Sequence, residues 1–192
     1  MVIAGVPRSG STWLFNATRL LIEASGSTLH SAWVADYRPA DHAEADFHLV
    51  KLHQPAELSF ACHCLLTTRR DAVSQLASLL RMGWLAPDGE VIRTRACELR
   101  GLYEFWAARS DLEIAYDQIC DQPELALQRV QAQIGLGSRG TDLSRVFDGL
   151  NRLKPPDTGR YDPLTLLHPG HAADATERSK YIEIVRAAMD GR

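Results

Sequence analysis

The sequence predicts an α/β fold of three layers, in which a central parallel sheet is flanked by helices. Short apolar stretches with strand character alternate along the chain with stretches in which apolar residues recur at helical spacing. This alternation favours parallel strands and helices on both faces of the sheet. A glycine-rich loop also joins the first apolar stretch directly to the first helical one, an arrangement typical of such folds.

Length and composition limit the remaining possibilities. The 192 residues suffice for one well-packed core, and we expect residues 1–192 to form a single domain. A net charge of −3 gives no broad positive field that would attract nucleic acid or an acidic membrane. No apolar run is long enough for a membrane span, and the start lacks the pattern of a signal peptide. We therefore expect a cytoplasmic protein that binds neither nucleic acid nor membrane.

The first 24 residues predict an anion site. Residues 2–4 form a short apolar strand, Gly5 and Gly10 frame a loop, and a helix runs from Ser11 to about Ala24. Backbone N–H groups at a helix start have no partners within the helix, and the helix dipole adds positive charge there. Glycine allows the backbone to approach a bound anion closely, so this junction is a candidate phosphate site.

The loop differs from the loop that binds nucleoside triphosphates. Its spacing matches Gly-x4-Gly-Lys-Ser/Thr, but Ser11 stands where the lysine is expected. Arg8 is the only cation between the two glycines. Because a triphosphate would lose its main counter-charge, the loop favours a ligand with fewer phosphates and its charge near Arg8.

Two further strands follow the first helix. Trp33 and Val34 suggest a short strand, and Phe47–His53 is the second clear strand. Alternation places Lys51 and His53 on the same side of this strand. The carboxyl ends of parallel strands face the ligand crevice, so both side chains are expected beside the phosphate loop.

A second junction between strand and helix carries cations. Residues 62–68 predict a strand that ends in Arg69 and Arg70, and Asp71 is a plausible cap of the next helix. The helix dipole disfavours cations at a helix start unless an anion joins them. Ser78 lies off the apolar face of this helix, which leaves it available for polar contacts.

The rest of the chain continues the alternation. A long helix is expected within residues 88–109, and Leu112, Ile114 and Tyr116 alternate as a strand. Asp121–Glu124 has the spacing of a capping box with an early proline. Further helices are expected from that box to Gly135, over about 141–153 and over 181–189.

The four cysteines do not have the paired spacing of a zinc site. Cys62 and Cys64 flank His63 but lead directly into an apolar strand, and Cys97 and Cys120 are isolated. We therefore expect no bound metal and interpret the thiols as reduced packing residues.

Three motifs in order along the chain resemble the sulfotransferases that use 3′-phosphoadenosine 5′-phosphosulfate (PAPS). Pro7–Trp13 looks like the family's 5′-phosphosulfate loop, and Val50–His53 is similar to its strand motif Lys-Thr/Ser-His. Arg70 and Ser78 match its arginine and the serine eight positions later. Residues 112–136 resemble its Arg-Tyr-Glu-Asp-Leu segment more weakly. The resemblance identifies the chain as a small, bacterial-type member with a sulfotransferase-like fold of the P-loop type.

The resemblance implies a role for each matching residue. His53 would be the catalytic base, and Lys51 and Arg8 would stabilise the charge that develops on the transferred group. The implied residues that bind the cosubstrate PAPS are Arg8, Ser9, Gly10, Ser11, Thr12, Trp13, Arg70 and Ser78. Trp13 is equally suited to packing in the core. At the junction after the strand 62–68, Arg69 is an alternative to Arg70 as the inward-facing cation, and Ser74 is an alternative to Ser78 as its partner.

The tail departs from the family pattern. The Arg-Lys-Gly loop that cytosolic members use for the 3′-phosphate is not found near the C-terminus, where the available polar groups are His168, His171, Arg178 and Lys180. The resemblance implies a small-molecule acceptor with a hydroxyl group. The candidate walls of its pocket are Trp33, Tyr37, Trp84 and the segment 168–171.

Two alternatives share the predicted architecture. A small-molecule kinase of the P-loop type would need a lysine near position 11 and carboxylates for magnesium, and neither is evident in the sequence. A non-catalytic nucleotide-binding protein would keep the fold without a working base.

Overall fold

A central sheet of five parallel strands organises the chain. The structure is a computed structural model, which describes residues 1–55, 58, 60–136, 142–157, 159, 161–169 and 175–191. Of residues 175–177 it describes only the backbone. The strand order is β2-β3-β1-β4-β5. The strands are β1 (Val2–Ala4), β2 (Leu29–Trp33), β3 (Phe47–Leu52), β4 (Leu65–Arg69) and β5 (Leu112–Ala115). All four pairings are parallel, as the alternating sequence predicts.

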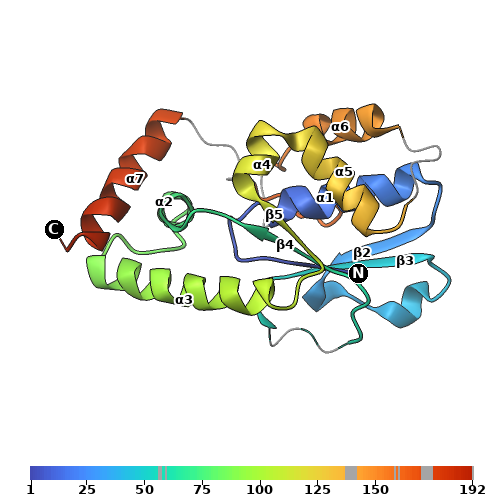
Figure 1. Cartoon of the computed structure of the whole chain (residues 1–192), viewed down its shortest axis with the longest axis horizontal. Coiled ribbons are helices and arrows are strands. Elements are labelled where there is room, and N and C mark those ends of the chain that lie inside the picture. Colours follow the sequence, from blue (N-terminus) through green and yellow to red (C-terminus); the bar gives the residue numbers. More distant parts are fainter. Residues whose placement is uncertain are drawn as a thin grey trace.

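Helices cover both faces of the sheet (Figure 1). They are α1 (Ser11–Ala24), α2 (Ala72–Arg81), α3 (Gly89–Ala107), α4 (Tyr116–Asp121), α5 (Pro123–Gln133), α6 (Leu143–Arg152) and α7 (Ala175–Met189). Helices α2, α3 and α7 pack on one face, and α1, α4, α5 and α6 pack on the other. Two short 3₁₀ turns, Val34–Asp36 and Pro39–His42, follow β2. The predicted three-layer fold is confirmed.

Alternation along the buried strands divides the core in two. In β1, Val2 and Ala4 face the layer of α2, α3 and α7, whereas Ile3 faces the layer of α1 and α4–α6. All three side chains are fully buried. A strand covered on both faces needs apolar residues at consecutive positions, which is why the sequence shows short continuous apolar runs there.

The order of the strands creates a crevice beside β1. The connection that leaves β1 runs toward β2, whereas the connection that leaves β4 runs toward β5 on the other side. Neighbouring parallel strands whose following connections diverge leave an opening beyond their carboxyl ends. Two loops lie at this opening: residues 5–10 and the residues around Arg70. The sequence predicts anion-binding residues in both loops.

The boundaries of β2, β3 and β4 differ from the sequence prediction, and β3 ends at Leu52, so that His53 lies just beyond the strand. The strand expected at Trp33 and Val34 is β2, which begins at Leu29 and ends at Trp33 because Val34 starts a 3₁₀ turn. As an edge strand that pairs only with β3, β2 tolerates polar residues such as His30, and these hide its strand signal. The β4 ladder begins at Leu65, opposite Val2, so residues 62–64 precede the strand.

The segment after β5 corrects two further predictions. Tyr116 is the first residue of α4 rather than a strand residue, and Asp121 ends that helix. Gln122, not Asp121, is the N-cap of α5, and it makes no side-chain cap bond. Pro123 explains the change, because proline restricts the preceding residue to extended backbone and is suited to the first helical position.

The other predicted helices are present. Helix α1 ends at Ala24, α3 lies within the expected range, and α7 begins six residues before the predicted start. Asp71 caps α2 as predicted, since its carboxylate accepts a hydrogen bond of 2.8 Å from the Ser74 amide. None of the helices among the described residues is both long and apolar enough to span a membrane.

The thiols are free, but the packing role predicted for them is only partly correct. Cys62 and Cys64 are half-buried, whereas Cys97 and Cys120 are exposed, because each lies on the solvent side of its helix. Within the described residues, no group of three or more His, Cys, Asp or Glu side chains is arranged to hold a metal ion.

Candidate functional site

The loop between β1 and α1 has a backbone shape that only certain residues tolerate. Gly10 has a φ of 100°, and a Cβ on Gly5 would lie 2.9 Å from the Ser11 Cβ. Arg8 also adopts a left-handed φ of 68°, which is uncommon for a residue with a side chain. Helix α1 then starts without a side-chain cap or an acidic residue in its first turn. Its first N–H groups therefore point toward the crevice as anion donors.

Side chains from α2 and β4 hold this loop in place. The Gln75 Nε2 donates to the Pro7 carbonyl at 2.6 Å, and the Ser9 and Thr68 hydroxyls are 2.6 Å apart. Gln75 is itself fixed by the Tyr103 hydroxyl, which donates to its Oε1 at 2.5 Å. The side chains of Ser9, Thr68, Gln75 and Tyr103 are buried, so the loop is rigidly supported before any ligand binds.

Arg70, not Arg69, faces the crevice. The Arg70 side chain is buried, its Nη1 donates to the Arg8 carbonyl at 2.9 Å, and its guanidinium lies 3.9 Å from the Tyr116 ring centroid. The Arg69 side chain is exposed and lies 3.8 Å from a Glu113 carboxylate oxygen. Arg70 directly precedes Asp71, the N-cap of α2. Its planar guanidinium stacks on the Tyr116 ring in a cation–π contact.

Ser78 contacts Arg8. The Arg8 Nε donates to the Ser78 Oγ at 2.8 Å, although 70 positions separate the two residues. Ser78 thus orients the one cation of the loop. Ser74, which the sequence leaves open as an alternative to Ser78, lines the same cavity beside α2 as Ser78 does.

Lys51 lies at the end of β3, behind the start of α1. Its Nζ donates to the Thr12 Oγ1 at 2.5 Å, and the residue is 3% exposed. Burial, and secondly the positive charge of Arg8, lower the pKa of Lys51 to about 7. An anion bound nearby would raise this pKa again, so the charge of Lys51 is coupled to ligand binding.

His53 follows β3 and is held by the phosphate loop. Its Nδ1 hydrogen-bonds the Gly5 carbonyl oxygen, which can only accept, so the Nδ1 carries the proton and the Nε2 of the neutral ring carries the lone pair. Burial, and secondly Lys51, lower the pKa of His53 to about 3. The ring of Trp33 meets His53 edge-on at a centroid distance of 5.0 Å. The imidazole is therefore neutral and fixed in orientation at physiological pH.

Two cavities meet at the loop. The Tyr116 cavity, about 230 Å³, lies over the start of α1 and is lined by Trp13, Arg70 and Tyr116. The His53 cavity, about 350 Å³, is lined by Lys51 and His53. Both cavities are also lined by Arg8, Ser11 and Thr12. A ligand in one cavity would thus reach a ligand in the other across these three residues.

The aromatic residues proposed as pocket walls divide into two groups. Trp33, Trp84 and His168 line the His53 cavity, and the rings of Trp84 and His168 meet edge-on at 5.3 Å. Tyr37 does not line it, because its hydroxyl hydrogen-bonds the His48 Nδ1 at 3.2 Å. His171 lies outside the described residues. Trp13 combines both predicted uses, since it lines the Tyr116 cavity and packs against the core.

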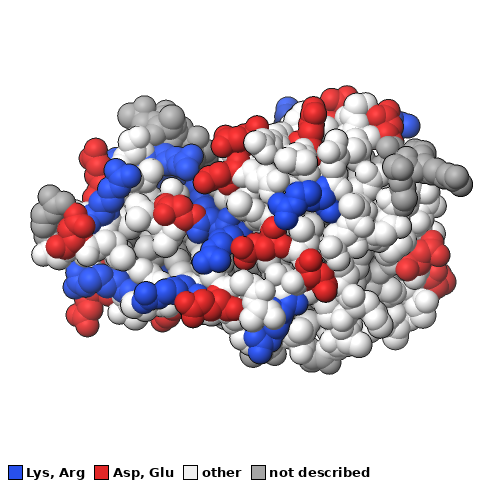
Figure 2. Space-filling model, viewed as in Figure 1, with Lys and Arg blue, Asp and Glu red and all other residues white. Residues whose placement is uncertain are grey.

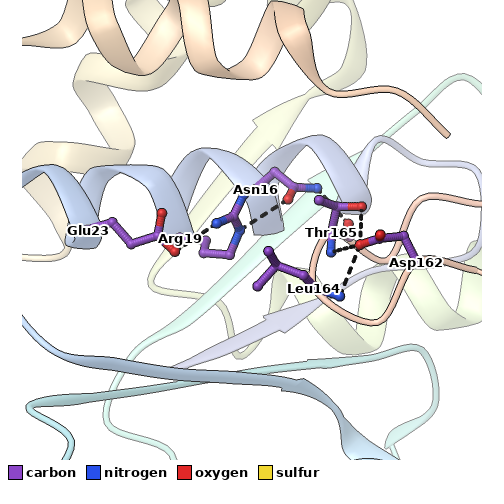
Figure 3. Close-up of polar contacts among 6 residues, drawn as sticks. All are labelled: Asn16, Arg19, Glu23, Asp162, Leu164 and Thr165. Atoms are coloured by element: carbon purple, nitrogen blue, oxygen red, sulfur yellow. Dashed lines mark hydrogen bonds and ion pairs between the residues drawn. The ribbon is translucent and has the colours of Figure 1, made fainter. Parts of the chain in front are cut away.

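A C-terminal segment, residues 161–168, runs beside α1 (Figure 3) and contributes to the lining of both cavities. The Asp162 Oδ1 accepts hydrogen bonds from the Leu164 amide, the Thr165 amide and the Thr165 hydroxyl at 2.7–3.0 Å. These Thr165 and Leu164 bonds lower the pKa of Asp162. The buried Asn16 Nδ2 donates to the Thr165 carbonyl at 2.7 Å and so ties the segment to α1.

This anchoring places two consecutive leucines in different cavities. Leu166 lines the His53 cavity, and Leu167 lines the Tyr116 cavity. Leu166 has a φ of 54°, a conformation that costs free energy for a residue with a side chain. The hydrogen bonds of Asp162 and Asn16 with the adjacent residues 164 and 165 stabilise this left-handed backbone at Leu166.

Sequence reasoning missed several residues of the site. Tyr116 stacks on Arg70, yet its spacing predicted a strand residue; its position directly after β5, at the carboxyl edge of the sheet, was the available signal. Tyr161 lines the His53 cavity, and its hydroxyl donates to the Asp36 Oδ2 at 2.9 Å. Asn16 and Tyr161 carry no sequence signal, because each contacts a segment more than a hundred positions away. The predicted residues Arg8, Gly10 to Trp13, Lys51, His53, Arg70 and Ser78 line three adjoining cavities, whereas the Ser9 side chain lines none of them, because it is buried with its hydroxyl against Thr68.

The fold and the loop define an α/β protein with a glycine-framed turn at the carboxyl edge of its sheet. No protein-family model matches the sequence, and no curated protein matches it. Among solved structures, the chain is similar to retinol dehydratase in complex with androsterone and the inactive cofactor PAP. The TM-score is 0.59 at 15% identity, and the match covers 98% of this chain and 78% of the other. The likeness shows a shared fold.

Proposed function

We propose that this chain is a small, bacterial-type sulfotransferase that transfers a sulfuryl group from PAPS to a hydroxyl group of a small-molecule acceptor. One observation carries the proposal: the cavity lined by Lys51 and His53 adjoins the Tyr116 cavity at Arg8, Ser11 and Thr12 of the phosphate loop. A two-substrate transfer needs such a junction, because donor and acceptor must approach in line. The PAP and androsterone bound by the retinol dehydratase support a donor and an acceptor of these classes.

The donor would occupy the loop and the Tyr116 cavity. Backbone amides of residues 9–12 and the Arg8 guanidinium would hold the 5′-phosphosulfate, which would end beside Lys51. The adenosine would lie in the Tyr116 cavity against Trp13. Arg70 and Ser78 would contact the 3′-phosphate and so distinguish PAPS from ATP.

The acceptor would occupy the His53 cavity. The His53 Nε2 would take the proton of the acceptor hydroxyl as the new bond between its oxygen and sulfur forms. The bond between sulfur and the bridging phosphate oxygen would break, and adenosine 3′,5′-bisphosphate would leave. Lys51 and Arg8 would stabilise the charge on the bridging oxygen and the sulfuryl group. The bound anion would also raise the pKa of His53 toward a value useful for a base.

No metal ion is required by this chemistry. The sulfuryl group carries less negative charge than a terminal phosphoryl group, and the cations Arg8 and Lys51 would lie where charge develops. A kinase would need carboxylates to hold magnesium, and no Asp or Glu is found among the described residues that line the Tyr116 and His53 cavities. The cavities therefore favour the sulfotransferase over the kinase.

Calorimetric titration tests the proposal directly. We expect adenosine 3′,5′-bisphosphate to bind with micromolar or tighter affinity and ATP with magnesium to bind at least tenfold more weakly. A preference for magnesium-ATP would overturn the proposal in favour of a kinase. Binding of the bisphosphate without transfer of sulfate to any of a panel of phenols and alcohols would favour a non-catalytic nucleotide-binding protein.

A further inference from the structure

A third cavity, which we call the arginine cavity, adjoins the phosphate loop on the side of α2. It encloses about 550 Å³ and is lined by Arg8, Arg70, Arg81 and Arg178 together with small polar side chains. Its described lining contains no Asp or Glu. Figure 2 shows basic side chains gathered in the hollow between α2 and α7 on one side and α4 on the other.

Two arginines of this cavity, Arg8 and Arg70, each have one nitrogen atom without a partner in the described part of the chain. These atoms are the Arg8 Nη1 and the Arg70 Nε, and both are buried. The Arg70 residue is only 9% exposed. Burial, and then the charges of Arg81 and Arg70, lower the pKa of Arg8 to about 10. Burial also lowers the pKa of Arg70, and Arg178 contributes through its charge.

This arrangement is unfavourable for the ligand-free protein and favourable for an anion. Buried cations without counter-charges cost free energy, and a bound anion supplies both the charge and the missing acceptors. Arginine is also the side chain best matched to the oxygens of a phosphate group. The arginine cavity is therefore organised around a group that is not part of the chain.

The position of the cavity indicates the shape of the ligand. The arginine cavity and the Tyr116 cavity are both lined by Arg8, Arg70 and Tyr116, so they adjoin at these residues. One molecule can thus place an anion at the α1 start, a ring system in the Tyr116 cavity and a second anion among the arginines. A nucleotide with a single phosphate would leave the arginine cavity without a counter-charge.

We infer that Arg81 of α2 and Arg178 of α7 bind the second phosphate of a bisphosphate nucleotide and thereby make the C-terminal helix part of the nucleotide site. The inference rests on the proposed function and extends it to two residues outside its motifs. Helix α7 packs on α2 and α3 through the buried Val185 and Ala188, which leaves its first turns beside the cavity. The bound phosphate would connect α2 to α7.

Calorimetry with two nucleotides isolates these contacts. Adenosine 3′,5′-bisphosphate and adenosine 5′-monophosphate are titrated into the wild type, Arg81→Gln and Arg178→Gln at low salt. Arg81→Gln and Arg178→Gln are each expected to lower the affinity for the bisphosphate by roughly tenfold, which is the effect of losing one charge-assisted hydrogen bond. The affinity for the monophosphate should fall by less than about twofold. Arg186→Gln is the matched control, since Arg186 is an exposed cation of α7 that does not line the cavity.

The possible outcomes separate this inference from the proposed function. If the wild type prefers the bisphosphate but neither Arg81→Gln nor Arg178→Gln changes that preference, the inference is wrong and the proposed donor stands. If the wild type binds both nucleotides equally, no second phosphate is recognised and the inference is wrong. If it binds neither, the inference and the proposed donor fail together. Unchanged thermal unfolding of each variant shows that the fold is intact.

Discussion

The Nε of Arg8 donates a hydrogen bond of 2.8 Å to the Oγ of Ser78, which joins the phosphate loop after β1 to the middle of α2. Arg8 lines all three cavities of the site, so its orientation affects each of them. Because the Arg8 backbone is left-handed and its Nη1 has no partner in the described chain, the Ser78 contact is a main restraint on the guanidinium.

Ser78→Ala should therefore weaken the binding of adenosine 3′,5′-bisphosphate by about five- to tenfold, since one side-chain hydrogen bond is worth about 1 kcal/mol. Ser74→Ala is the matched control, because Ser74 lines the same cavity and its amide bonds Asp71, whereas the hydrogen bond to Arg8 is made by Ser78. A larger loss for Ser74→Ala than for Ser78→Ala would show that Ser74 is the partner of the nucleotide. Isothermal titration calorimetry makes the comparison.

His53→Gln should abolish turnover without affecting the donor. Loss of a positioned base lowers the rate by roughly 10²–10⁴-fold. The affinity for adenosine 3′,5′-bisphosphate should remain within about twofold, because His53 lines only the acceptor side. His63→Gln, at an exposed position, should behave as the wild type in both assays. Turnover of His53→Gln at the wild-type rate would disprove the role of the base.

The dependence of kcat/KM on pH should reflect Lys51. With a pKa of about 7 in the ligand-free protein, Lys51 loses its charge as the pH rises through neutrality, and kcat/KM should fall above about pH 7. His53, with a pKa of about 3, should produce no acid limb between about pH 5 and 7. In Lys51→Arg the falling limb should disappear, because the guanidinium stays protonated. An unchanged limb in this variant would assign it to another group.

The stability of the protein should depend on Lys51 in the same pH range. The pKa of Lys51 lies below its ordinary value of 10.5, so between about pH 7 and 10.5 the unfolded chain binds more protons and stability rises with pH. The full cost of burying the cation is therefore present below pH 7. Lys51→Met should be more stable than the wild type at pH 6, by on the order of 1–3 kcal/mol after loss of the Thr12 hydrogen bond.

Urea denaturation at pH 6 and pH 9.5 measures this difference. The advantage of Lys51→Met should shrink at the higher pH, where the wild-type lysine is neutral in the folded state. Thr12→Val, which removes the hydroxyl contacted by Lys51 but keeps the buried cation, provides the comparison and should not be more stable at pH 6. A stability gain for Lys51→Met that is independent of pH would contradict the assigned cause.

Asn16→Ala should release the segment that contributes to the lining of both cavities. The substitution leaves the Thr165 carbonyl without its buried donor, which costs roughly 1–3 kcal/mol of stability. We also expect an increase of several-fold in the KM for the acceptor, since Leu166 would lose its support. Asn151→Ala, an exposed asparagine on α6, is the control and should change neither quantity. Thermal unfolding and steady-state kinetics provide the two measurements.

The sequence alone determined the parts of this protein that depend on neighbouring residues. The turn at Gly5–Gly10 and the shared side of Lys51 and His53 follow from local backbone geometry and from the two-residue period of a strand. The parallel sheet follows from the alternation of strands and helices, and its carboxyl edge from the direction of the chain. These features need no knowledge of how distant elements pack.

Tertiary structure decided the features that depend on packing between distant segments. Only the packing of α2 and α4 shows that Arg70 faces the crevice against Tyr116 while Arg69 faces solvent. The alternation of Leu112, Ile114 and Tyr116 predicted a longer strand and so hid that Tyr116 begins α4. The approach of Arg178 to Arg70 across more than a hundred positions, and the burial that lowers the pKa of Lys51, arise when the layers assemble, because desolvation and charge repulsion act through space.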